Sequence, residues 1–307
     1  MVYHVRSRVI SAPVLHAKGT SFAVEGTLVM GVVNASPDSF SDGQATDLDT
    51  QRARCDELVA AGADIVDIGG QSAITNRPEV EAGVEADLVV PLVEWMAAEH
   101  PGVLVSVDTY KPLVVDAVLD AGASIINDVS GLLHPEIVPS VIRHDAALVV
   151  MHTAAKPKVR RQDPQLYADV VGEVRGFLVE RLERVVALGL PRESVILDPG
   201  PDFTKTPHQT VELLRAIDAV RDLGRPVLLA LSRKDFLGAI TGRSPRGRDA
   251  ATAAAIAFFA SSPGNIVRVH DVAAARDVVA TVEVLAGLRD IPRDYLLPDA
   301  IRHEPRQ

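Results

Sequence analysis

Cysteine is almost absent from the sequence. Its 307 residues include a single cysteine, Cys55, which excludes an intrachain disulfide framework and a cysteine-rich zinc site. Cys55 lies at helical spacing from Leu58 and Val59, so we interpret it as a core thiol and not as a nucleophile. Stability must therefore come from an apolar core, for which 47% apolar residues are sufficient.

Long apolar runs and an excess of positive charge are also lacking. No stretch approaches the roughly 18 apolar residues of a membrane span, and the N-terminal MVYHVRSRVISAPVLHAKGT lacks the apolar centre of a signal peptide. The net charge is −10, with 31 Lys and Arg against 41 Asp and Glu, whereas nucleic-acid binding needs clustered basic residues. We expect a cytoplasmic protein that binds neither membranes nor nucleic acids.

Short runs of valine, isoleucine and leucine alternate with longer amphipathic stretches. Eight of these runs are predicted as strands: 28–34, 64–69, 103–108, 124–129, 147–152, 194–199, 226–232 and 265–270. Their apolar residues are continuous, which is typical of parallel strands buried on both faces. Apolar residues recur every three or four positions in 49–63, 113–123, 167–189 and 275–288, which predicts helices. Gly62, Gly122 and Gly189 are expected to end the first three of them.

Eight such strand–helix units in about 250 residues match a (β/α)8 TIM barrel. A doubly wound open sheet is the alternative, but it normally carries a glycine-rich turn after its first strand. The segment NASPDSFSDG, which follows the first predicted strand, is no such turn. The sequence therefore favours the barrel, whose active site lies at the C-terminal ends of the strands.

Every predicted strand ends on a polar or charged group. These residues are Asn34, Asp67, Asp108, Asn127 with Asp128, His152, Asp198, the Ser232-Arg233-Lys234 segment, and Arg268 with His270. Any single one could be a helix cap, and for Asp67 and Asp128 capping and a functional role are equally supported. Eight polar strand ends out of eight instead indicate one polar pocket.

The polar strand ends divide by charge. Asp108, Asn127 and Asp198 could bind a flat, nitrogen-rich ring, because a carboxylate accepts two parallel N–H donors. Lys234, Arg268 and His270 follow the last two strands, where barrels tend to bind phosphate, so the pocket suits a nitrogenous ring that carries a phosphate or diphosphate. His152, His270 and Asp108 could form a metal-ligand set, but no motif supports a zinc site. Mg²⁺ bound by Asn34 and a diphosphate is compatible with the oxygen ligands of that ion.

Seven segments of the chain resemble dihydropteroate synthases. They are MGVVNASPDSFSDG, GADIVDIGG, SVDTYKP, GASIINDVSG, ILDPGPDF-K, SRKDFLG and VRVHDV, in order between about residues 28 and 272. The resemblance implies a single pterin-binding (β/α)8 barrel over 26–290, with an N-terminal extension over 1–25 and a C-terminal tail over 291–307. It also implies a transferase of folate biosynthesis that joins a dihydropterin diphosphate to p-aminobenzoate and releases diphosphate. The family is commonly dimeric, so a homodimer is expected.

The resemblance also implies a role for each matching residue. Asp108, Asn127, Asp198 and Lys234 would bind the pterin, while Asn34, Arg268 and His270 would bind the diphosphate with Mg²⁺ on Asn34. Lys234 would also share in catalysis with Asn34, Arg268 and His270. The positions expected beside the aminobenzoate or in its loops are Asp38, Ser39, Phe40, Ser72, Arg77, Phe203, Lys205, Ser232 and Arg233.

Three segments depart from the family pattern. The usual GGESTRPG is GGQSAITNRPEV (69–80), so Gln71 replaces a glutamate, and only Arg77 could supply the family's arginine. The usual DPGIGFGK is DPGPDFTK, where Asp202 and Thr204 replace glycines that reach φ > 0 without strain. Ala230 replaces a further glycine near the pterin. Two alternatives remain: a divergent paralogue that uses another amine or is inactive, and a pterin-binding methyltransferase, which would not need the SRK and RVH cations.

Overall fold

A closed parallel barrel forms the centre of the protein. The computed structural model describes residues 11–35, 47–71 and 78–303, and in it eight strands pair in the order β10-β3-β4-β5-β6-β7-β8-β9. They are β3 (Thr27–Asn34), β4 (Ile65–Gly69), β5 (Leu104–Asp108), β6 (Ile125–Asp128), β7 (Ala147–Met151), β8 (Val195–Asp198), β9 (Val227–Leu229) and β10 (Asn265–Val269). Each of the eight predicted strands is present, so the (β/α)8 barrel is confirmed.

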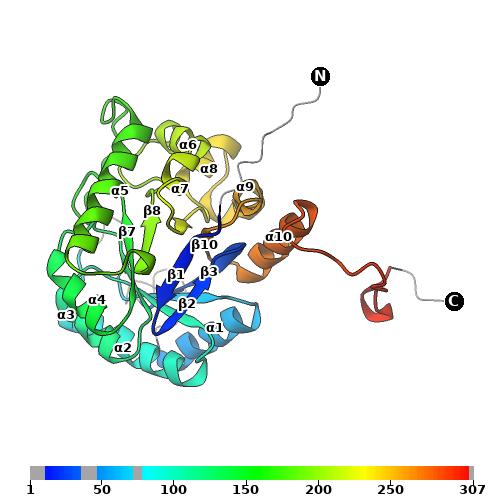
Figure 1. Cartoon of the computed structure of the whole chain (residues 1–307), viewed down its shortest axis with the longest axis horizontal. Coiled ribbons are helices and arrows are strands. Elements are labelled where there is room, and N and C mark those ends of the chain that lie inside the picture. The colour runs from blue at the N-terminus through cyan, green and yellow to red at the C-terminus, as the bar shows by residue number, and fades with distance from the viewer. Residues whose placement is uncertain (1–10, 36–46, 72–77, 304–307) are drawn as a thin grey trace.

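Helices surround the barrel (Figure 1). They are α1 (Leu48–Ala60), α2 (Ala82–Glu99), α3 (Pro112–Asp120), α4 (Val138–Arg143), α5 (Val170–Ala187), α6 (Pro207–Arg215), α7 (Asp218–Arg221), α8 (Asp235–Thr241), α9 (Asp249–Ala260) and α10 (Val272–Leu285). All three predicted stops have the left-handed backbone that glycine favours, with φ of 92° at Gly62, 108° at Gly122 and 102° at Gly189. None of the helices in the described ranges is long and apolar enough to cross a membrane.

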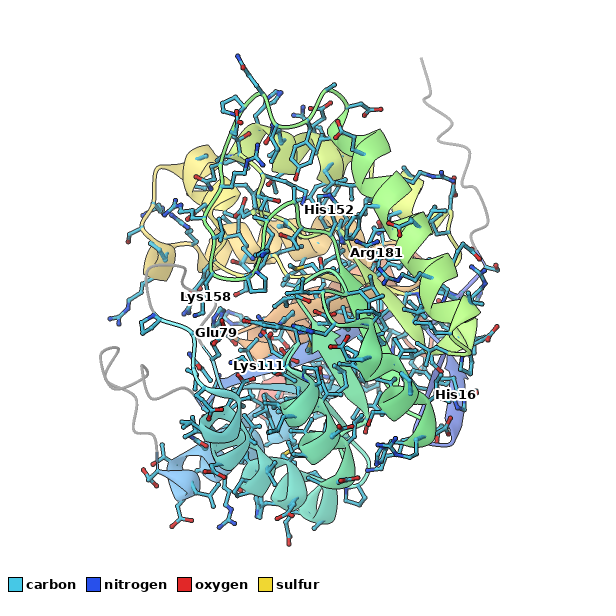
Figure 2. All side chains as sticks on the ribbon, turned by 90° about the vertical axis from the view of Figure 1, so that its left-hand side faces the viewer. His16, Glu79, Lys111, His152, Lys158 and Arg181 are labelled. Carbon is cyan, nitrogen blue, oxygen red and sulfur yellow. The ribbon has the colours of Figure 1, made fainter. Side chains whose placement is uncertain are left out.

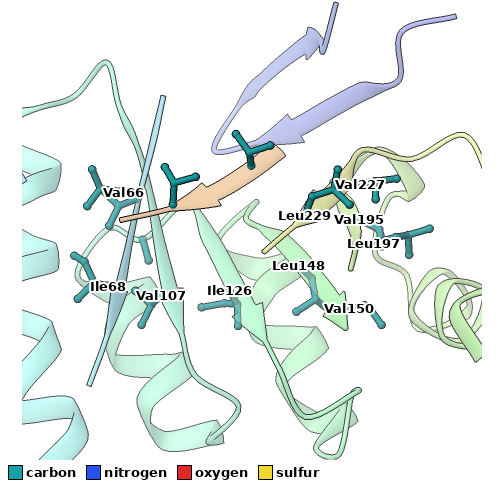
Figure 3. Packing of buried hydrophobic residues seen from close by; sticks show 14 of the residues in the cluster. Val66, Ile68, Val107, Ile126, Leu148, Val150, Val195, Leu197, Val227 and Leu229 are labelled. Atoms are coloured by element: carbon teal, nitrogen blue, oxygen red, sulfur yellow. The ribbon is translucent and has the colours of Figure 1, made fainter. Parts of the chain in front are cut away.

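The largest part of the core lies between the strands and the helices. Alternate strand residues point outward from the barrel, among them Val66, Ile68, Val107, Ile126 and Leu148 (Figure 3). Cys55 is completely buried in this layer, and burial raises the pKa of its thiol to about 12. The thiolate is therefore scarce at neutral pH, as expected for a core residue.

A hairpin that the sequence analysis did not predict covers the N-terminal end of the barrel. Strands β1 (Val14–Ala17) and β2 (Thr20–Ala23) pair antiparallel within the predicted N-terminal extension. Leu15 and Ala17 are buried against the inward-facing residues at the lower ends of the barrel strands, such as Met30 and Ile196. The barrel interior is thus closed at this end, and its polar residues gather at the other.

Candidate active site

A cavity of about 420 Å³ opens at the C-terminal ends of the strands. Five residues predicted to share one pocket line it together: Asp108, Asn127, Asp198, Lys234 and Arg268. Asp108 and Asp198 end their strands, and Asn127 is the penultimate residue of β6. Their side chains point into the barrel, because each lies two residues beyond an inward-facing residue such as Ile125 or Ile196. The predicted grouping of acidic, amide and basic side chains at one barrel mouth therefore matches the geometry.

Arg268 binds two carboxylates across the cavity floor. Its Nε donates to Asp67 Oδ2 at 2.7 Å, and its Nη2 donates to Asp108 Oδ2 at 3.1 Å. Asp67 is completely buried and also accepts hydrogen bonds from Ser106 Oγ at 2.6 Å and Asn127 Nδ2 at 3.2 Å. Asp67 is thus no helix cap, and the basic and acidic groups are interleaved on this floor instead of lying on two separate flanks.

Asn127 presents an unpaired buried acceptor to the cavity. The residue is 1% exposed, its Nδ2 donates to Asp67, and its Oδ1 has no hydrogen-bond partner among the described residues. A buried polar atom without a partner costs about 1–3 kcal/mol, which a ligand N–H can recover. The neighbouring Asp128 does not line the cavity: its carboxylate accepts the N–H groups of Ser130 and Leu132 at 2.7 and 3.0 Å and so stabilises the turn that follows β6.

The two cavity carboxyl groups hold their protons unusually tightly. Burial raises the pKa of Asp108 to about 7, although Arg268 opposes the shift. Burial also raises the pKa of Asp198 to about 6, opposed by the N–H of Gly200 and by Lys234. Desolvation lowers the pKa of Lys234, whose Nζ lies 4.4 Å from the ring centre of Phe203. Phe203 and Lys234 therefore form a cation–π pair beside the carboxylates.

The segment 200–205 keeps a left-handed backbone without the family's glycines. Asp202 has a φ of 63° and Thr204 a φ of 53°, and such a conformation is strained for a β-branched residue. Side-chain contacts offset the strain: Asp202 accepts hydrogen bonds from Thr210 Oγ1 at 3.1 Å and from the N–H of Phe236 at 3.2 Å. The loop therefore keeps its left-handed conformation although two glycines are replaced.

The sequence predicted Lys205 beside the cavity, but the structure places its side chain in the core. It is completely buried, and its Nζ binds His152 Nδ1 at 2.8 Å and the carbonyls of Gly200 and Phe203 at 2.9 and 3.0 Å. Burial lowers the pKa of Lys205 to about 7 and, with repulsion from Lys205, that of His152 to about 3. Through these contacts the buried side chain of Lys205 holds the loop that carries Phe203.

Ser232, His270 and Asn34 lie at the rim of the barrel and outside the cavity lining. Ser232 Oγ and His270 Nδ1 are 2.9 Å apart, and Asn34 is an exposed residue at the end of β3. Desolvation and repulsion from Arg268 lower the pKa of His270 to about 4, so its ring is neutral at pH 7. Arg233 lines the cavity but binds Asp249, with its Nε 2.8 Å from Oδ1. No group of three or more His, Cys, Asp or Glu residues in the described ranges could hold a metal ion.

A hydrogen-bond network joins the two ends of the segment 69–80. Gln71 Oε1 accepts from the N–H of Val80 at 2.8 Å and from Lys111 Nζ at 3.3 Å, while its Nε2 lies 3.3 Å from Tyr110 Oη. Lys111 Nζ also binds buried Glu85 at 2.6 Å. Gln71, which replaces the family's glutamate, is therefore well paired. The predicted loop residues Asp38, Ser39, Phe40, Ser72 and Arg77 lie outside the described residues.

Sequence reasoning missed one wall of the cavity. The consecutive residues 156–162, in the loop after β7, line it and include Lys156, Lys158, Arg160 and Arg161. Figure 2 shows Lys158 on the same side of the molecule as Glu79 and Lys111, which belong to the loops after β4 and β5. The available signal was four cations within KPKVRR in an otherwise acidic chain.

Comparisons with known proteins agree with this geometry. A family model described as pterin binding enzyme matches residues 30–270. The dihydropteroate synthase of Streptococcus pyogenes is 37% identical over 269 residues, which cover 86% of this chain and 98% of that protein, and the Bacillus subtilis enzyme is 37% identical over 262 residues, covering 84% and 89%. A Yersinia pestis dihydropteroate synthase in a sulfonamide drug complex superposes with a TM-score of 0.83 at 32% identity, covering 90% of this chain and 100% of that chain. The Xanthomonas albilineans enzyme with 4-aminobenzoic acid gives 0.81 at 36%, covering 90% and 98%.

Proposed function

The chain belongs to the dihydropteroate synthase family of pterin-binding enzymes, and on that premise we propose how its cavity joins a dihydropterin diphosphate to p-aminobenzoate. The amine nitrogen forms a bond to the methylene carbon of the pterin. The bond from that carbon to the diphosphate oxygen breaks, its electron pair leaves with diphosphate, and the amine releases a proton. An arylamine is already a neutral nucleophile, so the step needs little help from a general base.

The unpaired Asn127 Oδ1 carries the proposal. It lies between the strands that present Asp108 and Asp198, so one acceptor and two carboxyl groups face the same cavity. A pterin ring offers several N–H donors on one edge. Each would form a buried or charge-assisted hydrogen bond with one of these acceptors, in place of the water that the ring loses on binding. Lys234 would approach the same ring from the Phe203 side.

The opposite rim supports binding of the leaving diphosphate. His270 and Ser232 follow β10 and β9, and Asn34 ends β3, which pairs with β10. Donors at these positions would stabilise the charge that grows on diphosphate as the carbon–oxygen bond breaks. Asn34 supplies one amide oxygen, which fits a Mg²⁺ ion held mainly by diphosphate oxygens, because Mg²⁺ often keeps only one or two protein ligands. Such an ion would neutralise part of the diphosphate charge.

Calorimetry and a product assay test the proposal together. We expect binding of the pterin diphosphate, and release of diphosphate only when p-aminobenzoate is also present. Binding without release would identify the chain as an inactive paralogue. Transfer of a folate methyl group to a corrinoid, with no release of diphosphate, would identify a methyltransferase and overturn the proposal.

Further features stay predictions that can be tested separately. A homodimer is supported by exposed apolar side chains on three neighbouring helices, Ile240 on α8, Phe258 on α9 and Leu285 on α10, and sedimentation at micromolar concentration would test it. The division at residues 25 and 290 and the cytoplasmic location rest on the sequence alone.

A further inference from the structure

The wall formed by residues 156–162 has more positive charge than p-aminobenzoate requires. Lys156, Lys158, Arg160 and Arg161 lie within six residues and all line the cavity, whereas p-aminobenzoate carries one carboxylate. Two arginines of the wall form long ion pairs, Arg160 to Asp235 at 3.9 Å and Arg161 to Asp163 at 3.8 Å, between exposed side chains. Exposed pairs of this kind contribute about 0–1 kcal/mol, so these guanidinium groups can exchange their partners for a ligand.

The wall lies on the side of the amine substrate. It follows β7, whereas the diphosphate rim is formed by β3, by β10 and by Ser232 after β9. In the closed barrel order β7 is four strands away from β3, three from β10 and two from β9. The pair between Arg160 and Asp235 places the wall next to Lys234, which contacts the Phe203 ring. A substrate tail that extends out of the cavity past Phe203 therefore contacts the wall.

The strained residue Thr204 anchors this wall. Its Oγ1 accepts a hydrogen bond from the N–H of Ala154 at 3.0 Å and lies 3.0 Å from Tyr167 Oη. Ala154 precedes the wall and Tyr167 follows it, so one hydroxyl ties both ends of the loop to the segment 200–205. Gln209 Nε2 adds a second anchor by donating to the carbonyls of Asp163 and Pro164 at 3.1 and 3.2 Å. A glycine at position 204 could make neither of the Thr204 contacts.

We propose that the wall formed by residues 156–162 is an anion subsite for the far end of the amine substrate. The preferred amine is then an arylamine with at least two anionic groups. The inference rests on the proposed function, because the bonds that form and break are the same and only the tail of the amine differs. Thr204 acts as a positioning residue, which accounts for a β-branched residue at a φ of 53°.

Three amines test the subsite: p-aminobenzoate, p-aminobenzoyl-glutamate and p-aminobenzoyl-glutamine. The last two have nearly the same shape and differ by one carboxylate. We expect kcat/KM for diphosphate release to be about fivefold higher with the glutamate than with the glutamine compound, the worth of one additional ion pair at a partly exposed site. The difference should shrink as salt is raised.

Variants identify the wall as the cause. The quadruple variant K156Q/K158Q/R160Q/R161Q should bring the ratio of the two kcat/KM values close to one. A matched control, R175Q/R184Q/R215Q/R246Q, removes four exposed arginines outside the cavity lining and should keep the wild-type ratio. Tyr167→Phe, which removes one of the Thr204 contacts, should lower the ratio in part.

The outcomes separate the subsite from the proposed function. Equal kcat/KM for the glutamate and glutamine compounds in the wild type, alongside normal turnover of p-aminobenzoate, would overturn the subsite alone. A ratio lowered equally by the control variant would assign the effect to overall charge and would also overturn it. Failure of all three amines to release diphosphate would reject the proposed function itself.

Discussion

Arg268 and Asp67 form the central contact of the cavity floor. Arg268 leaves β10, passes across β3 and donates through Nε to Asp67 on β4 at a distance of 2.7 Å, where the carboxylate is completely buried. A buried carboxylate needs such a partner, because removing its hydration is costly. The contact also fixes the orientation of Arg268, so that its Nη2 reaches Asp108, one of the proposed pterin ligands.

Asp67→Asn should destabilise the protein by about 3 kcal/mol, the usual cost of removing one partner of a buried ion pair. The midpoint of urea unfolding should fall, with an unchanged dependence on urea concentration. Asp49→Asn is the matched control, because it makes the same chemical change in the exposed pair with Arg52 and should cost less than about 1 kcal/mol. Equal effects of the two substitutions would contradict the structural role of Asp67.

Binding of the pterin should depend on pH through Asp108 and Asp198. Their pKa values are raised to about 7 and about 6, so both lose their negative charge as the pH falls from 8 to 5. The protonated groups accept N–H donors less well, and the affinity for an uncharged probe, 6-hydroxymethylpterin, should fall over that range. Calorimetry at several pH values measures this dependence. An affinity that is constant from pH 5 to 8 would exclude the two carboxylates as pterin ligands.

The same carboxyl groups affect stability with the opposite sign. Their folded pKa values lie above the ordinary aspartate value of 3.8, so protonation favours the folded state. This contribution is complete below about pH 4 and is lost as the pH rises through about 6 to 7. Asp108→Asn should weaken pterin binding at pH 8 by about 1.5–3 kcal/mol, the worth of a charge-assisted hydrogen bond. It should also leave a pH dependence governed by Asp198 alone.

His270→Ala should lower kcat more than it raises KM. The side chain lies at the rim with Ser232, away from the carboxylates of the cavity floor, so its contact strengthens only as diphosphate departs. Because His270 lies at the rim and not in the enclosed part of the cavity, we expect a loss of about tenfold to a hundredfold in kcat, at or below the lower limit for an enclosed donor. His208→Ala, which removes a largely exposed histidine on α6, is the control. Wild-type turnover by the His270 variant would reject the assignment.

The sequence predicted the barrel because its signals were local. Continuous apolar runs gave the eight strands, and the glycines at 62, 122 and 189 gave the helix ends. The polar strand ends likewise predicted which side chains face one cavity. What a single strand could not reveal was pairing across the barrel, so the partner of Asp67 was unknown and Lys205 was expected in the cavity. Both depend on contacts between distant segments.

The cationic wall and the N-terminal hairpin were missed for different reasons. KPKVRR has no periodicity, and only the long loop from β7 to α5 brings it over the cavity. The hairpin strands are only four residues each, and most of their residues are not buried. Their two-residue turn, Lys18-Gly19, has both residues at positive φ but lacks the Asn-Gly or Asp-Gly pair typical of such turns. Their place is set by side-chain contacts with the barrel: His16 binds Asp145 at 2.8 Å, and Arg225 binds the carbonyl of Val14.

Leu15→Ala should destabilise the protein by about 2–5 kcal/mol, the range for truncating a buried leucine. Leu15 is completely buried where the hairpin closes the barrel interior, and the removed atoms would leave a cavity that the closed strands cannot collapse to fill. Val14→Ala is the control, because Val14 precedes Leu15 on the same strand and is 38% exposed, whereas Leu15 is completely buried. Urea unfolding of the two variants measures the difference. If both lost the same small amount of stability, the hairpin would be a surface attachment and not part of the barrel core.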